Sequence, residues 1–230
     1  MYKFLLTASL LILPVFGLTH EGQTKVYTPV IENTTSQSLY QEMDLQGKVN
    51  KKAFDMAVAG YEKIPERKRD VLTLIDFSKP SNEKRLFVFD MKNKKLLFSS
   101  VVAHGRNSGG LMATQFSNQN GSHKSSLGFY LTQNTYQGKN GYSLVLEGLE
   151  KGLNDNARRR AIVMHGANYA NPSVVKNGGR LGRSFGCPAL PHQLNRPIID
   201  AIKGGSVLYI YASSNDYLAK SSILKKENKG

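Results

Sequence analysis

The chain has 230 residues, which is enough for one sizeable core and too few for two full domains. Apolar residues make up 40% and charged residues 21%, an ordinary globular composition that excludes a low-complexity or fibrous chain. The formal net charge of +14 predicts attraction to anionic polymers, and the lack of a helix-turn-helix or base-stacking pattern argues against nucleic acid.

The first 17 residues have the pattern of a secretory signal peptide. Lys3 supplies a positive charge, residues 4–13 are almost wholly apolar, and Pro14 and Gly17 precede a plausible cleavage point. An uncleaved anchor is the less favoured alternative, because the apolar run is short for a membrane span. We therefore expect an exported protein, periplasmic or associated with the cell wall, where the anionic partners are cell-wall polymers.

The next segments change from polar to helical. Residues 18–47 are polar and predict a linker or loosely ordered arm. Apolar residues then recur at helical spacing over residues 49–63, with Gly60 near the end and Pro65 beyond it. Residues 48–70 are therefore expected to form a helical annex.

From residue 71 the hydrophobic pattern becomes that of strands. We predict a helix over residues 191–202, two long loops over residues 105–124 and 168–185, and strands over residues 71–77, 85–90, 96–103, 128–132, 143–146, 161–164 and 206–211. The fold class is mostly β, a sandwich or partly closed barrel with a few helices and the N-terminal annex. The domain spans residues 71–214, and a basic polar tail covers residues 215–230.

Cys187 is the only cysteine, so it cannot form an internal disulfide. Gly186 allows a tight turn before it, and Arg183 and Arg180 place positive charge nearby, which favours a thiolate. The backbone N–H groups of Phe185, Gly186 and Cys187 are candidates for an oxyanion hole. A buried structural thiol is the alternative, but a loop rich in glycine and arginine is an unusual place for one.

A thiol nucleophile needs a base, and two histidines follow apolar runs. His165 ends the run 161–164 and precedes Gly166, and it is the preferred base. His104 occupies a similar place before Gly105. The basic run at residues 158–160 is interpreted as a solvated face in preference to an anion site.

Two other chemistries remain as alternatives. His104, His123, His165 and Cys187 have donor atoms that suit zinc, but no pair has a familiar metal-ligand spacing. A serine hydrolase lacks support, because no G-x-S-x-G elbow is present. Both are weaker alternatives to a cysteine nucleophile.

The motif His165-Gly166, followed by Ser184-Phe185-Gly186-Cys187, resembles the catalytic motif of the YkuD-type L,D-transpeptidases, a His and then Ser/Thr-His-Gly-Cys. The segment SSLGFY at residues 125–130 is similar to that family's Thr-Pro-x-Gly-x-Phe/Tyr segment. The resemblance covers residues 71–212 and is closest to a divergent branch of murein L,D-transpeptidase catalytic-domain proteins. It implies a β-sandwich-like barrel without a metal or an organic cofactor.

The resemblance also implies roles for particular residues. Cys187 would attack the L-to-D amide of a peptidoglycan stem peptide, and His165 would take the thiol proton. The carbonyl of Gly166 would orient the imidazole, and Ser184 would support the cysteine loop. Transfer of the acyl group to an amine gives a cross-link, whereas transfer to water gives an L,D-carboxypeptidase or endopeptidase. A non-catalytic cell-wall binding module is a further alternative, and no feature of the sequence indicates an oligomeric state.

The chain departs from the family motif at two positions. Phe185 stands where the family has a second His, and Ala189 stands where an Arg or Asn is usual. A nearby arginine is expected to replace the missing charge, and His104 to fill part of the gap. The candidate substrate contacts are therefore Arg183, Arg180, His104 and Ser126.

Overall fold

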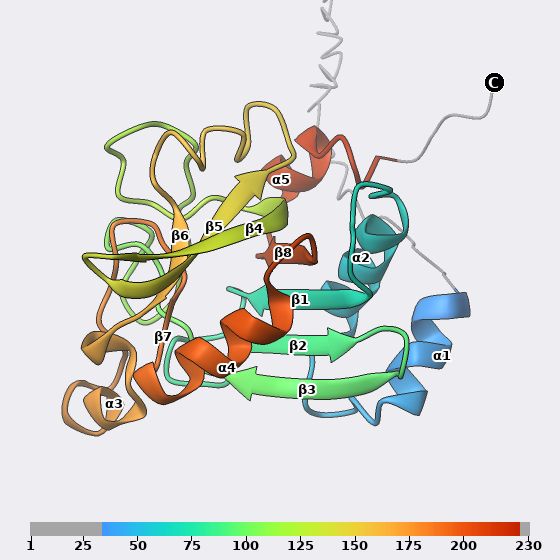
Figure 1. The fold of residues 1–230 in the computed structure, drawn as a ribbon, viewed down its shortest axis with the longest axis horizontal. Coiled ribbons are helices and arrows are strands. Elements are labelled where there is room, and N and C mark those ends of the chain that lie inside the picture. The colour runs from blue at the N-terminus through green and yellow to red at the C-terminus, as the bar shows by residue number, and fades with distance from the viewer. Residues whose placement is uncertain (1–33, 226–230) are drawn as a thin grey trace, which may run out of the picture.

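Eight strands form the centre of the structure, a computed structural model that describes residues 34–225 (Figure 1). In chain order they are β1 (Val71–Asp76), β2 (Leu86–Asp90), β3 (Lys95–Ser100), β4 (Gly128–Gly138), β5 (Gly141–Gly148), β6 (Val163–Gly166), β7 (Ala189–Leu190) and β8 (Val207–Tyr211).

The strands make one mixed sheet that nearly closes into a barrel. Their order is β3-β2-β1-β8-β4-β5-β6-β7, with β1 and β8 parallel, β6 and β7 parallel, and the other pairs antiparallel. Beyond β3, Ala103 forms an antiparallel bridge with Ala189 of β7, which joins the two edges of the sheet. The predicted mostly β, partly closed barrel is confirmed.

The helices surround this sheet. They are α1 (Thr34–Glu42), α2 (Lys51–Glu62), α3 (Pro172–Gly178), α4 (His192–Ile202) and α5 (Asn215–Lys220), with a short 3-10 turn η1 (Asn168–Ala170). α2 packs against β1 and β8, and α4 packs against β1, β5 and β6 (Figure 1). No helix among residues 34–225 has the length and apolar character that a membrane span requires.

Local sequence explains why α2 begins and how it docks. The Asn50 side chain accepts a hydrogen bond from the Ala53 N–H, which caps the first turn. A Cβ atom placed on Gly60 would lie 2.0 Å from Cζ of Phe129. The glycine therefore lets the helix approach β4 closely, at the cost of some helix propensity.

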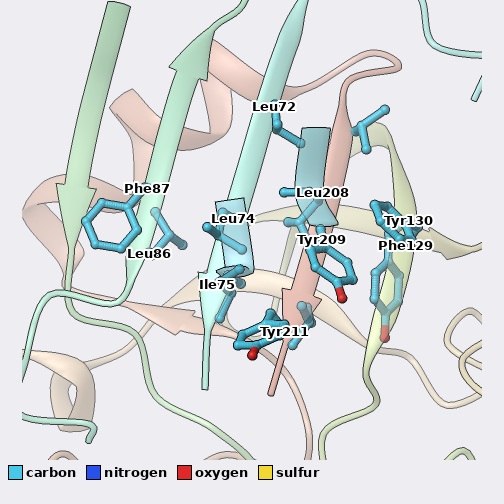
Figure 2. Close-up of a cluster of buried hydrophobic side chains, with 14 of the residues drawn as sticks. Leu72, Leu74, Ile75, Leu86, Phe87, Phe129, Tyr130, Leu208, Tyr209 and Tyr211 are labelled. Atoms are coloured by element: carbon cyan, nitrogen blue, oxygen red, sulfur yellow. The ribbon is translucent and has the colours of Figure 1, made fainter. Parts of the chain in front are cut away.

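The core is centred on the parallel pair β1 and β8, whose residues are all buried. Figure 2 shows their side chains beside those of β2 and β4. The Phe129 and Tyr209 rings stack with centroids 4.1 Å apart. Burial on both faces of these strands stabilises the sheet that carries the candidate site.

Two segments expected to be loose contain helices. The predicted arm at residues 18–47 includes α1, with Leu39, Tyr40, Met43 and Leu45 buried in the core. The predicted tail includes α5, where the Tyr217 hydroxyl donates to Oε2 of the buried Glu150 at 2.9 Å. Tertiary burial of a few apolar side chains supports the described parts of these segments, residues 34–47 and 215–225, despite their polar composition. The predicted signal peptide, residues 1–17, lies outside the described residues.

Candidate active site

Cys187 lies just before β7, beside the start of β6. Its Sγ accepts a hydrogen bond from the Val163 N–H at 3.5 Å and donates to the Ala161 carbonyl at 3.6 Å. The side chain is half-buried. The thiol is therefore held at the start of β6, and the partly buried side chain packs against the edge of the hydrophobic core.

The turn before Cys187 needs a glycine. Gly186 has φ +126°, and a Cβ atom there would lie 2.8 Å from the Lys124 carbonyl oxygen and 2.9 Å from Cδ1 of Ile162. Ser184 closes the turn, because its hydroxyl accepts from the Gly186 N–H at 3.0 Å and donates to the Cys187 carbonyl at 2.6 Å. The conformation of the thiol loop thus depends on Gly186 and Ser184 together.

Replacing Gly186 by alanine is expected to lower the free energy of unfolding by about 3 kcal/mol, because backbone strain adds to a clash with backbone atoms. Urea unfolding followed by circular dichroism measures this change. The matched control is Gly178→Ala, because a Cβ atom on Gly178 would meet nothing within 4 Å and its φ is not positive. Its stability should stay within about 1 kcal/mol of the wild type. Equal unfolding midpoints for the two variants would contradict the strained turn.

His165 lies on β6, the strand that pairs with β7 just after Cys187. It is buried in β6, 4% exposed, and its Nδ1 lies 3.0 Å from the Gly166 carbonyl oxygen. A carbonyl only accepts, so Nδ1 carries the hydrogen and Nε2 is left as the basic nitrogen. This is the orienting contact expected of Gly166.

The register of β6 and β7 sets the relation between His165 and the thiol. His165 pairs with Ala189, two residues after Cys187, while Val163 donates to Cys187 Sγ. Cys187 and His165 are therefore diagonal neighbours on adjacent segments. No hydrogen bond joins Nε2 to Sγ between these two described residues, and such contacts commonly tighten only when substrate binds.

Electrostatics keep the resting pair neutral. Burial raises the pKa of the Cys187 thiol, against the lowering effects of the Val163 N–H and the Arg160 charge. Burial lowers the pKa of His165, and the nearby His192 lowers it further. A neutral thiol and a neutral imidazole are thus favoured at pH 7.

The positive charge that acts on the thiol comes from Arg160, a residue that the sequence led us to expect in solvent. Arg158 and Arg159 are exposed, but Arg160 is half-buried and donates to the carbonyl oxygens of Ser117 at 2.8 Å and Lys124 at 2.6 Å. The sequence gives no signal that distinguishes Arg160 from the other two arginines of the run. Only the fold shows which one turns inward.

Arg180 and Arg183 do not take the expected role beside the thiol. Arg183 donates to the carbonyl oxygens of Arg106 and Gly109, and Arg180 donates to that of Leu181. Their charges lower the pKa of His104, not that of Cys187. Contact of either arginine with a substrate stays a prediction.

His104 has structural partners in place of the expected substrate contact. It is fully buried, its Nδ1 accepts from Nη2 of Arg85 at 2.7 Å, and its Nε2 faces the Gly109 carbonyl at 3.4 Å. Burial and the Arg85 charge lower the pKa of His104 to about 4. The ring is neutral at pH 7, and both of its nitrogens face internal partners, so neither is free for a substrate.

Ser126 is also occupied. Its hydroxyl donates to the Ser117 carbonyl at 2.8 Å and accepts from Arg160, and the residue is 3% exposed. Ser125 instead reaches the cysteine loop, since it donates to the Gly186 carbonyl at 3.0 Å and accepts from the Gly105 N–H at 3.0 Å. Both serines belong to the SSLGFY segment, and the pattern of residues gives no signal that separates them.

The predicted oxyanion hole needs one correction. The Gly186 N–H donates a hydrogen bond to the Ser184 hydroxyl, so it is not free for a substrate oxygen. Phe185 is 63% exposed, and its ring lies 4.6 Å from His123 and 5.0 Å from the Arg106 guanidinium carbon. The N–H groups of Phe185 and Cys187 remain as the candidate donors.

The described residues do not assemble the donors of a zinc site. No three His, Cys, Asp or Glu side chains converge within residues 34–225. His104 is engaged with Arg85 and His123 packs on Phe185, so two of the four donors considered from the sequence point elsewhere. Among residues 34–225, the donors named for the zinc alternative therefore do not come together.

Comparison with known proteins gives one family and several structures. A family model described as the L,D-transpeptidase catalytic domain matches residues 45–211. No curated protein matches the sequence.

Among solved structures, an L,D-transpeptidase from Mycobacterium smegmatis is similar at 13% identity and TM-score 0.39, over 62% of this chain and 59% of that one. The helical cell shape determining protein Pgp2 from Campylobacter jejuni is similar at 13% identity and TM-score 0.42, over 70% and 56%. An L,D-transpeptidase from Stackebrandtia nassauensis is similar at 14% identity and TM-score 0.37, over 76% and 75%. The chain thus spans 59% of the length of the Mycobacterium smegmatis structure.

Proposed function

The chain belongs to the L,D-transpeptidase catalytic-domain family, and we propose that it is a cysteine acyltransferase acting on peptidoglycan stem peptides. Cys187 is the nucleophile in this proposal and His165 is its base. The observation that carries it is the placement of the only thiol of the chain one strand from an imidazole whose Nδ1 is fixed by Gly166. That arrangement leaves Nε2 free to accept a proton.

The proposed reaction starts from the neutral pair. As Sγ attacks the carbonyl carbon of the L-to-D amide, its proton passes to Nε2 of His165. The tetrahedral oxyanion is met by the N–H groups of Phe185 and Cys187. The C–N bond then breaks, and His165 returns the proton to the leaving amine, a terminal D-amino acid.

The second half of the cycle resolves the thioester on Cys187. An amine from a neighbouring stem attacks the acyl carbon, and His165 takes a proton from that amine. The C–S bond breaks, the thiol is restored, and a new amide joins the two stems. Water in place of the amine gives the carboxypeptidase or endopeptidase outcome, our second candidate, which the half-exposed position of the thiol also permits.

The site of action is part of the proposal. We infer that the chain is exported by its first 17 residues and works on the wall outside the cytoplasm. Its formal charge of +14 supports attraction to anionic wall polymers. Fractionation of expressing cells tests this: the protein should appear outside the cytoplasm with residues 1–17 removed, and full-length protein in the cytoplasm would overturn it.

Purified muropeptides test the chemistry directly. The protein is incubated with disaccharide-tetrapeptides and the products are separated and weighed by mass spectrometry. Cross-linked dimers with release of a terminal D-amino acid support transfer to an amine. Shortened stems without dimers favour hydrolysis, and unchanged substrate under conditions where the protein is folded would contradict both.

A further inference from the structure

We propose that Arg160 is a positioning residue of the thiol site, which ties the loop at residues 117–126 to the Cys187 turn and offers its charge to the thiolate. The inference deepens the proposed function and, for its role in turnover, rests on it. The effect of Arg160 on the ionisation of the Cys187 thiol is testable without peptidoglycan.

The guanidinium of Arg160 is held from both of its terminal nitrogens. Nη1 donates to the Ser117 carbonyl at 2.8 Å and to the Ser126 hydroxyl at 2.5 Å. Nη2 donates to the Ser122 hydroxyl at 3.2 Å and to the Lys124 carbonyl at 2.6 Å. Through the planar fork of its guanidinium, Arg160 thus holds residues 117–126 of the long loop in one conformation.

All four acceptors are neutral. Among residues 34–225, no carboxylate lies within ion-pair distance of Arg160, whereas Arg158 in the same run pairs with Glu147. Hydrogen bonds to carbonyl and hydroxyl groups fix the guanidinium but leave its charge uncompensated. A half-buried charge of this kind is screened less by water than a surface charge.

This charge lies against the turn that carries the thiol. A Cβ atom on Gly186 would lie 3.3 Å from Arg160 Nη2 and 2.8 Å from the Lys124 oxygen that Nη2 binds. The next residue along from Arg160, Ala161, accepts the hydrogen bond of Cys187 Sγ through its carbonyl. The Arg160 charge lowers the pKa of Cys187, in opposition to burial.

The two effects have one chemical consequence. Burial alone makes the thiolate costly to form, and attack requires negative charge on Sγ in the reaction's early stage. A fixed guanidinium beside the turn reduces that cost without becoming a proton donor. Arg160 therefore acts through Cys187 and the loop and has no need to touch the substrate.

Thiol alkylation tests the inference with little ambiguity, because Cys187 is the only cysteine. The rate of reaction with iodoacetamide is measured from about pH 6 to about pH 10 for the wild type, Arg160→Gln, Arg160→Lys and Arg159→Gln, with thermal unfolding as a check of folding. Arg159 is the matched control, since it is the exposed neighbour in the same basic run.

We expect Arg160→Gln to move the midpoint of the pH profile upward and to slow alkylation at pH 7 by about threefold to tenfold. Arg160→Lys should have a midpoint close to that of the wild type, because lysine retains the positive charge. Arg159→Gln should match the wild type in both midpoint and rate.

Three results would overturn the inference. The first is an unchanged midpoint of the pH profile in folded Arg160→Gln, and the second is a shift of equal size in Arg159→Gln. The third is faster alkylation of Arg160→Gln at every pH, because that result would mean only that the loop has opened. If Arg160→Gln does not fold, the inference rests on Arg160→Lys, and a midpoint in that variant clearly above that of the wild type would also overturn it. Muropeptide turnover plays no part in these outcomes. A normal alkylation shift with no turnover would instead count against the proposed function alone.

Discussion

Cys187→Ala is expected to abolish acyl transfer, with a fall in kcat of at least about a thousandfold. Alanine has no atom that can form the thioester, and no second cysteine exists to replace it. Residual binding of the stem peptide should persist, because the sheet and the Ser184 contacts do not depend on Sγ. Dimer formation from muropeptides, followed by mass spectrometry, measures the loss.

Stability provides the control for this variant. Within residues 34–225 the thiol makes two weak hydrogen bonds, with Val163 and Ala161, so its removal should cost no more than about 1 kcal/mol in unfolding free energy. Cys187→Ser should be folded and nearly as inactive, since a serine hydroxyl is a poorer nucleophile beside a neutral imidazole. Turnover by folded Cys187→Ala at a rate near the wild type would remove the thiol from the mechanism.

His165→Gln should lower kcat by about a hundredfold or more and remove the acidic limb of the pH profile. Because burial lowers the pKa of His165 from 6.5, the imidazole is neutral above that value, and wild-type activity should fall only below about pH 6.5. Stability should follow the same pH range: a depressed histidine pKa carries no penalty above pH 6.5, where the imidazole is neutral in both states, and it destabilises the folded state as the pH falls below that value. Initial rates from about pH 4 to about pH 9 test the activity profile, and unfolding free energies over the same range test the stability.

His192→Gln is the matched comparison. His192 is exposed at the start of α4, and its charge lowers the pKa of His165. Its replacement should leave the plateau rate intact and move the acidic limb to slightly higher pH. An acidic limb that survives in His165→Gln, or that moves to lower pH in His192→Gln, would show that another group controls the profile.

Several parts of the fold followed from the sequence because their signals are local. The apolar runs at residues 71–77 and 206–211 predicted β1 and β8, and helical spacing with a glycine and a proline predicted α2. The same holds for α4 and for the irregular stretch between β3 and β4. The short elements were missed, since two-residue β7 and six-residue α5 exist through their partners and not through propensity.

In the candidate site, too, the features with local signals were predicted and those that depend on tertiary contacts were not. The lone cysteine, the glycine before it and the histidine at the end of an apolar run are visible as residue types in order, and the structure brings Cys187 and His165 to adjacent segments. Sequence order alone did not distinguish Arg160 from its two neighbours, or Ser125 from Ser126. It also favoured His104, whose ring the fold turns toward Arg85.

The sequence by itself therefore determined the mostly β class, the chemistry available at a single thiol, and a base of the right kind. Only the tertiary structure decided which charged residue lies near that thiol, which hydroxyls hold its loop, and that the Gly186 N–H is already bonded. The physical reason is that these contacts join segments far apart in the chain, and their outcome depends on burial. Cys187 and Arg160 are 27 positions apart and act on each other because β6 and β7 pair side by side.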